Sequence, residues 1–147
     1  MTETCRQPCC TAPRLTVTEL LERGLRRNRA APLAFEGVSC SNTEGHLARF
    51  SLEVANGKVA AVGFRASSCA TLIAYCELIA ETVPGLSREL AGGLSPRDLV
   101  DALPGVPLLK RERAVLAVAA FHAALSSLLD EQGESNEGRI HLRYPAP

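Results

Sequence analysis

Apolar and polar residues alternate over residues 48–54, which predicts a β-strand with one buried face. Every second position in this stretch is apolar: Ala48, Phe50, Leu52 and Val54. Asn56-Gly57 then separates this run from a similar one, and this dipeptide is the strongest short signal for a β-hairpin because both turn positions need positive φ. Residues 33–42 also have an extended pattern. Together these runs predict a three-stranded antiparallel meander.

The hydrophobic period changes from two to about 3.6 after Cys69, which predicts a helix that ends at Pro84-Gly85. Its apolar residues fall on one face: Leu72, Tyr75, Cys76, Ile79 and Val83. Glu77 and Glu81 fall elsewhere and are expected away from the core. Further helices are predicted over 15–28 with Thr16 or Thr18 as the cap, over 94–105 with Ser95 as the cap, and over 110–133. The expected fold class is α+β, a small meander sheet with helices packed on one face.

The two ends of the chain lack such periodicity. Residues 1–14 contain Cys5, Cys9 and Cys10 and are predicted to form a flexible arm. The folded domain is expected over residues 15–131. Residues 132–147 are interpreted as a tail without a helical pattern, in which "RIHLRY" could add a short edge strand.

Length and charge narrow the class of protein. The chain has 147 residues, 46% of them hydrophobic, which suits one globular domain, and its 16 basic and 16 acidic residues cancel. This balance argues against a nucleic-acid or anionic-membrane partner. We see neither an apolar run long enough for a membrane span nor a secretory signal, so a cytoplasmic location is expected. In that reducing compartment the six cysteines are expected to be free thiols or metal ligands. Their even number is also compatible with disulfide pairs, so the count alone excludes neither possibility.

Cys69 and Cys76 differ in their expected chemistry. Cys69 lies at a strand-to-helix junction, where free helix N–H groups favour a thiolate, so we predict a reactive or ligating thiol. The alternative is that Cys69 is a small buried residue that only fills space at this junction. Cys76 lies about 10.5 Å further along the predicted helix, too far to share a metal ion with Cys69. We therefore assign Cys76 to the core.

Cys40 is the second candidate thiol. It lies in "GVSCSN", whose glycine and polar residues indicate an exposed loop between two strands, and an exposed cysteine there can be a nucleophile or a ligand. In a meander followed by a helix, the loop after the first strand and the end of the third strand can share one edge of the sheet. Cys40 and Cys69 are therefore expected to converge.

These motifs resemble the U-type iron-sulfur cluster assembly scaffolds, the NifU-like or IscU-like proteins. The resemblance covers nearly the whole chain after Leu15 and includes "VSCSN", the "ANGKVAAVGF" hairpin, "SCA" at the helix start and "GLSPRDLVDALPG" before the last helix. By position Cys40 and Cys69 match two of the family's three cysteines, and Asn42 replaces its aspartate. Arg113 stands where the third cysteine belongs, next to Glu112.

The resemblance implies a scaffold or carrier that binds iron or a labile cluster, expected to be [2Fe-2S], through Cys40 and Cys69. A cluster generally takes four donors, mostly thiolates. Glu112 could add a weaker carboxylate ligand, and Asn42 would alter the charge near the site. Arginine cannot bind a metal; Arg113 could neutralise thiolate charge or form a salt bridge with Glu112. Thiols of the N-terminal arm could complete the site, or the arm could be inactive.

Two other functions stay open. The chain could be a SufE-like persulfide sulfur-transfer adaptor that uses Cys40, or a binding module of the assembly machinery without chemistry. No acid–base pair, triad or nucleotide loop is visible, so we do not expect an enzyme. The implied partners are a cysteine desulfurase and recipient apo-proteins, and whether the chain forms a homodimer is open. His122 is interpreted as a satisfied helix residue, whereas His46 and His141 are left unassigned.

Overall fold

The computed structural model describes residues 16–141, with side chains described as far as Leu128. In chain order the elements are α2 (Val17–Arg29), β1 (Phe35–Glu36), β2 (Cys40–Ser41), β3 (Leu47–Ala55), β4 (Lys58–Ala66), α3 (Ala70–Thr82), α4 (Arg88–Gly92), α5 (Pro96–Ala102), the 3-10 helix η1 (Leu108–Lys110) and α6 (Arg113–His141). The predicted caps at Thr16 and Ser95 are confirmed, and each side chain forms a capping box with the third residue of its helix.

The sheet is an antiparallel meander whose first strand is interrupted. β3 and β4 form a long hairpin, and its turn residues Asn56 and Gly57 have φ values of 56° and 78°, as predicted. β1 and β2 both pair with β3, through Phe35↔Leu52 and Cys40↔Ala48 respectively. They therefore follow one another along the same edge of β3, and the sheet has four strands in place of the three predicted.

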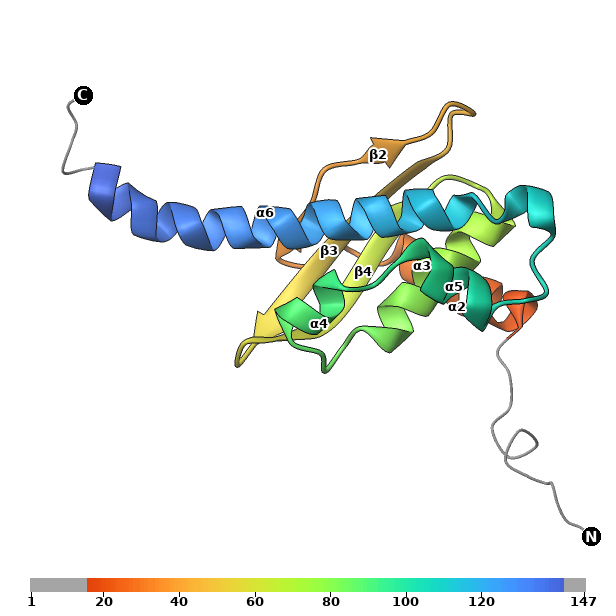
Figure 1. Cartoon of the computed structure of the whole chain (residues 1–147), viewed down its shortest axis with the longest axis horizontal. Coiled ribbons are helices and arrows are strands. Elements are labelled where there is room, and N and C mark those ends of the chain that lie inside the picture. The colour runs from red at the N-terminus through yellow and green to blue at the C-terminus, as the bar shows by residue number, and fades with distance from the viewer. Residues whose placement is uncertain (1–15, 142–147) are drawn as a thin grey trace, which may run out of the picture.

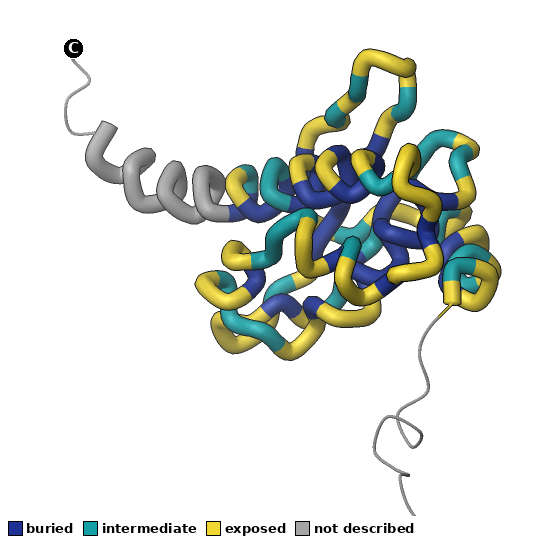
Figure 2. Tube along the Cα trace, turned by 45° about the vertical axis from the view of Figure 1, so that its right-hand side comes forward, coloured by how far each residue is buried: buried dark blue, intermediate teal, exposed yellow. Residues whose placement is uncertain are grey.

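Helices α3 and α6 cover one face of this sheet, as expected for the fold class (Figure 1). Phe50 of β3 lies at the centre of the core, where its ring centroid is 5.8 Å from that of Phe64 and 5.7 Å from that of Phe121 on α6. The predicted apolar face of α3, including Cys76, is completely buried. Figure 2 shows the buried residues concentrated where the sheet meets α3 and α6.

Glu77 is a correction to the predicted helix pattern. It was expected away from the core, but it is fully buried because α2 packs over that side of α3. Burial raises the pKa of the Glu77 carboxyl, and its hydrogen bond with Arg27 opposes this rise. Arg27 Nε lies 2.7 Å from Glu77 Oε1, and Arg27 Nη1 donates to the carbonyl of Val62 at 3.1 Å. This ion pair fixes α2 against both α3 and the sheet.

The C-terminal segment also differs from the prediction. α6 continues through residues 132–141, so this part of the predicted tail is helical and Arg139, Ile140 and His141 form no edge strand. Once a helix is nucleated, each further residue adds a hydrogen bond without a new nucleation cost. The predicted N-terminal arm with its three cysteines lies outside the described residues. Among the described residues, none of the helices is long and apolar enough for a membrane span.

His122 is not the satisfied residue that was predicted. Its Nε2 atom is buried without a hydrogen-bond partner in the described structure. The centroid of its ring lies 6.0 Å from the ring centroid of Phe121.

Gly37 permits close contact between the edge of the sheet and α6. A Cβ atom at this position would lie 2.4 Å from the Cα atom of Ala124. We therefore expect Gly37→Ala to lower the free energy of unfolding by about 1–3 kcal/mol, the usual cost of overpacking. Urea denaturation measures this effect. Gly105→Ala is the matched control because open space surrounds that residue; an equal loss in both variants would contradict the packing explanation.

Candidate functional site

Cys40 and Cys69 lie at the same end of the sheet. Cys40 begins β2 and is opposite Ala48, which in turn is opposite Ala66 on β4. Directly opposed residues share a face, and Ala48 is buried, so Cys40 faces the helices. Cys69 follows Ala66 by three residues. Both thiols thus lie at one end of the sheet, and their convergence on one ligand stays a prediction. The prediction of a loop around Cys40 is wrong, since this half-buried residue belongs to a strand.

Cys69 is the N-cap of α3, as the sequence predicted. Its backbone is extended, and its N–H donates to the carbonyl of Ser67 at 2.7 Å. Partial burial alone would raise the pKa of the Cys69 thiol, but the backbone N–H of Leu72 and the Arg113 guanidinium hold that pKa below its usual range. This environment favours the thiolate form of Cys69 over its thiol form more than in a free cysteine. Burial raises the pKa of the Cys76 thiol far above its usual range, which makes Cys76 inert.

Arg113, the first residue of α6, connects three groups of the site. It is only 9% exposed. Its Nη2 atom lies 3.1 Å from Glu44 Oε1, its Nη1 atom pairs with Glu112, and its hydrogen bond with Cys69 raises the pKa of the guanidinium. The salt bridge with Glu112, one of the two roles considered for Arg113 from the sequence, is present. Arg113 therefore places a fixed positive charge near the Cys69 sulfur.

Asn42 organises the loop that carries Glu44. Asn42 Oδ1 accepts hydrogen bonds from the backbone N–H groups of Glu44 at 3.0 Å and His46 at 2.9 Å, and Asn42 Nδ2 lies 3.2 Å from His46 Nδ1. Gly45 completes the turn with a φ of 88°. Asn42 therefore positions the carboxylate that binds Arg113. Glu44 was not among the residues predicted from the sequence, although an asparagine two residues before it in "NTEG" is typical of such a turn.

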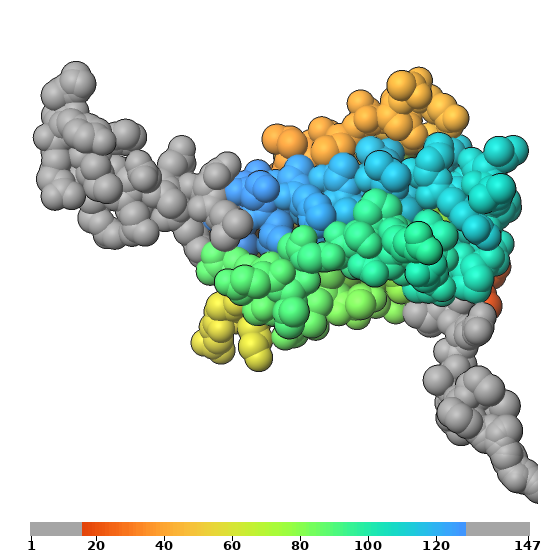
Figure 3. Space-filling view, in the orientation of Figure 1, coloured from red at the N-terminus to blue at the C-terminus, as the bar shows by residue number. Residues whose placement is uncertain are grey.

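Cys40, Asn42 and Glu112 line a hollow of about 310 Å³ together with Thr43 and Val115. This hollow lies between the segment around β2 and the start of α6; Figure 3 shows that segment in orange along one side of the blue helix. Cys69 is not among the residues that line the hollow. Within residues 16–128, no three His, Cys, Asp or Glu side chains gather closely enough to hold a metal ion. Iron binding by Cys40, Cys69 and Glu112 therefore stays a prediction.

The family model described as "NifU-like N terminal domain" matches residues 22–135 of the chain. The chain belongs to this family. The resemblance seen in the sequence is thus confirmed over most of the NifU-like chain, including all of β1 to α5. No curated protein matches the chain.

Two solved structures are similar to this NifU-like chain. A protein from Fervidobacterium islandicum AW-1, described as a candidate iron-sulfur cluster assembly scaffold for the SUF system, has 13% identity and a TM-score of 0.52, with 72% of this chain and 93% of that chain covered. The N-terminal part of a nitrogen-fixing NifU-like protein from Brucella abortus has 20% identity and a TM-score of 0.42, with 75% and 81% covered. At these identities the first likeness shows the fold alone.

Proposed function

We propose that this NifU-like chain is a scaffold or carrier in iron-sulfur cluster assembly, which binds iron or a nascent cluster through Cys40 and Cys69 and passes it on. The observation that carries this proposal is that Cys40 and Cys69 lie at the same end of the sheet. The lowered pKa of the Cys69 thiol agrees with it. Thiolates are the form in which cysteine binds iron. The family and the scaffold described for the SUF system support the proposal.

The ligand set explains why such binding would be weak. Cys69 and Cys40 supply two soft donors, and Glu112, which lines the hollow beside Cys40, supplies a harder oxygen donor. A stable cluster generally has four donors, most of them thiolates. Arg113 must also leave the Cys69 sulfur before iron can approach it. We therefore propose a labile cargo, in the form of iron or a [2Fe-2S] cluster, that is easily released to a recipient.

The cellular setting belongs to the same proposal. Sulfur would come from a cysteine desulfurase in the cytoplasm, and recipient apo-proteins would take the cluster. In this role the chain catalyses no net reaction and acts as a carrier.

A second function, sulfur transfer, is favoured by the contact between Arg113 and Cys69. The Cys69 thiolate would attack the outer sulfur of a donor persulfide, so that a new S–S bond forms on Cys69, the donor S–S bond breaks and the donor cysteine leaves as a thiolate. The oxidation state of the pair as a whole does not change. We assign this step to Cys69, in place of the Cys40 proposed from the sequence, because Arg113 lowers the pKa of Cys69.

Anaerobic reconstitution with ferrous iron and sulfide tests the proposed function. We expect the wild type to retain iron that a chelator removes readily, and Cys40→Ser and Cys69→Ser to retain none. Cys76→Ser is the matched control because that buried thiol cannot contact solvent, and it should retain iron as the wild type does.

Mass spectrometry after incubation with a persulfide donor separates the other functions. A gain of one sulfur atom at Cys69 without iron retention would favour sulfur transfer. If the wild type gains neither iron nor sulfur, the proposal is wrong and the binding-module function replaces it.

A further inference from the structure

Two arginines lie directly opposite each other on the face of the sheet away from the core. Arg49 of β3 pairs with Arg65 of β4, and both residues are exposed. Their neighbours along the strands, such as Ala48 and Phe64, are buried, so the two arginines point to the opposite face. Like charges in directly opposed positions repel each other across a ladder. The sheet therefore carries a local concentration of positive charge.

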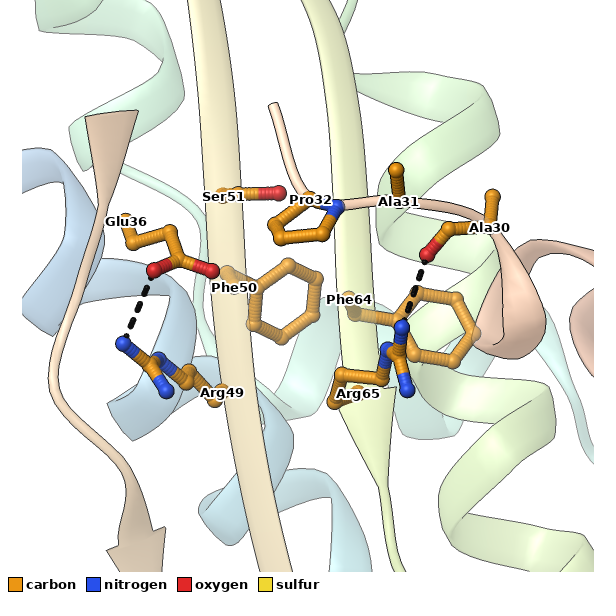
Figure 4. A pocket seen from close by; sticks show the side chains of 9 residues that line it. All are labelled: Ala30, Ala31, Pro32, Glu36, Arg49, Phe50, Ser51, Phe64 and Arg65. Carbon is orange, nitrogen blue, oxygen red and sulfur yellow. Dashed lines mark hydrogen bonds and ion pairs between the residues drawn. The ribbon is translucent and has the colours of Figure 1, made fainter. Parts of the chain in front are cut away.

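Only one described carboxylate is paired with these two guanidinium groups. Arg49 Nη2 donates to Glu36 Oε1 at 3.0 Å, and its Nε donates to the carbonyl of Gly37 at 3.0 Å. Arg65 Nη2 donates to the carbonyl of Ala30 at 3.1 Å. Figure 4 shows Glu36 on the side of Arg49 and the Ala30 carbonyl on the side of Arg65. A guanidinium has five N–H donors, so Arg65 has donors left for a ligand and the pair keeps a net positive charge.

The two arginines separate two hollows of different chemistry. The hollow in Figure 4 is lined by Glu36, whose carboxylate would repel an anion. The second hollow, which we call the arginine hollow, has a volume of about 300 Å³, and its polar lining consists of Arg49, Arg65, Ser39 and Ser67. No carboxylate lines it. Its described walls therefore offer guanidinium and hydroxyl groups to a negatively charged ligand.

We propose that the arginine hollow binds an oxyanion, a phosphate or carboxylate group. Planar guanidinium groups bind both kinds of oxyanion in a bidentate manner. Both arginines line this one hollow, so an anion bound there would be attracted by both positive charges. This site goes beyond the proposed function and does not depend on it.

The arginine hollow lies at the same end of the sheet as the thiols but on the other face. Ser39 directly precedes Cys40, and Ser67 precedes Cys69 by two residues. An oxyanion bound in this hollow would therefore contact chain segments that lie within two residues of Cys40 and Cys69. A ligand or partner anchored by its acid group would lie close to the end of the sheet where Cys69 is housed.

Titration with inorganic phosphate, followed by NMR of the arginine side-chain N–H signals at constant ionic strength, tests the site. We expect saturable shifts of the Arg49 and Arg65 signals. Arg65→Gln should weaken phosphate binding by at least about tenfold, because charge-assisted hydrogen bonds are lost. Glu36→Gln should tighten binding several-fold, because it frees Arg49 from its carboxylate. Arg97→Gln is the matched control, since that exposed arginine lies on α5 beside Asp101 and should have no effect.

The same titration with succinate separates the two sources of oxyanion. Tighter binding of phosphate supports a phosphorylated ligand, and tighter binding of succinate supports a carboxylate ligand. The opposite effects of Glu36→Gln and Arg65→Gln cannot both arise from loss of folding. If phosphate and succinate shift the signals no more than chloride does, or if Arg97→Gln weakens binding as much as Arg65→Gln, the proposal is wrong.

Discussion

Arg113→Cys should raise the affinity of the site for ferrous iron by on the order of 100-fold. Arg113 is the first residue of α6, and its guanidinium interacts with Cys69 strongly enough to raise the pKa of the guanidinium. The substitution therefore removes this fixed cation and places a third soft donor near the Cys69 sulfur. If the roughly 10–16 kcal/mol of a four-ligand thiolate site is shared equally, each ligand contributes about 3 kcal/mol, and about 1.4 kcal/mol is tenfold. Competition with a chromophoric chelator under anaerobic conditions measures the change.

Arg113→Ser is the matched control for this prediction. It removes the same cation and the same ion pairs with Glu44 and Glu112, and its side chain has the size of cysteine without the thiolate. We expect it to bind iron far more weakly than Arg113→Cys. If both variants bind iron equally well, loss of the cation is sufficient and the missing thiolate is not the cause of weak binding. No iron in either variant would show that Cys40 and Cys69 do not bind one iron together.

Cys69 should react with iodoacetamide at least about 100-fold faster than Cys76 in the folded protein at neutral pH. Alkylation requires an accessible thiolate. Arg113 and the N-terminus of α3 stabilise this form at Cys69, whereas Cys76 is completely buried and its pKa is raised. Cys76 can react only when the core opens. Pulse labelling followed by peptide mass analysis gives the two rates separately.

The pH dependence of the same labelling tests the role of Arg113. Because the pKa of Cys69 is lowered, its rate should reach half of its plateau at a pH below the value of about 8.5 for a free cysteine. Arg113→Gln should move this midpoint to higher pH and slow the reaction at pH 7, while Arg97→Gln should change neither. An unchanged midpoint in Arg113→Gln would show that the helix N–H groups alone stabilise the thiolate.

Prediction of the site from the sequence succeeded where local structure decides the environment. Cys69 was correctly placed at a helix start and Cys76 in the core, because the change of hydrophobic period fixes both positions along the chain. Cys40 was correctly placed at the shared sheet end but wrongly assigned to a loop. The short β2 strand that contains it forms only through its pairing with β3. A strand of two residues is too short to show an alternating pattern from which such pairing could be predicted.

The sequence by itself determined the hairpin, the capped helices and the face that each long element buries. Alternation along β3, the Asn56-Gly57 turn and the apolar face of α3 are local properties, since side-chain periodicity and allowed φ values act within a few residues. Only the tertiary structure decided which distant side chains meet. Glu44 reaches Arg113, and Arg27 reaches the buried Glu77, because the packing of whole helices and loops against the sheet places these charges within reach of each other.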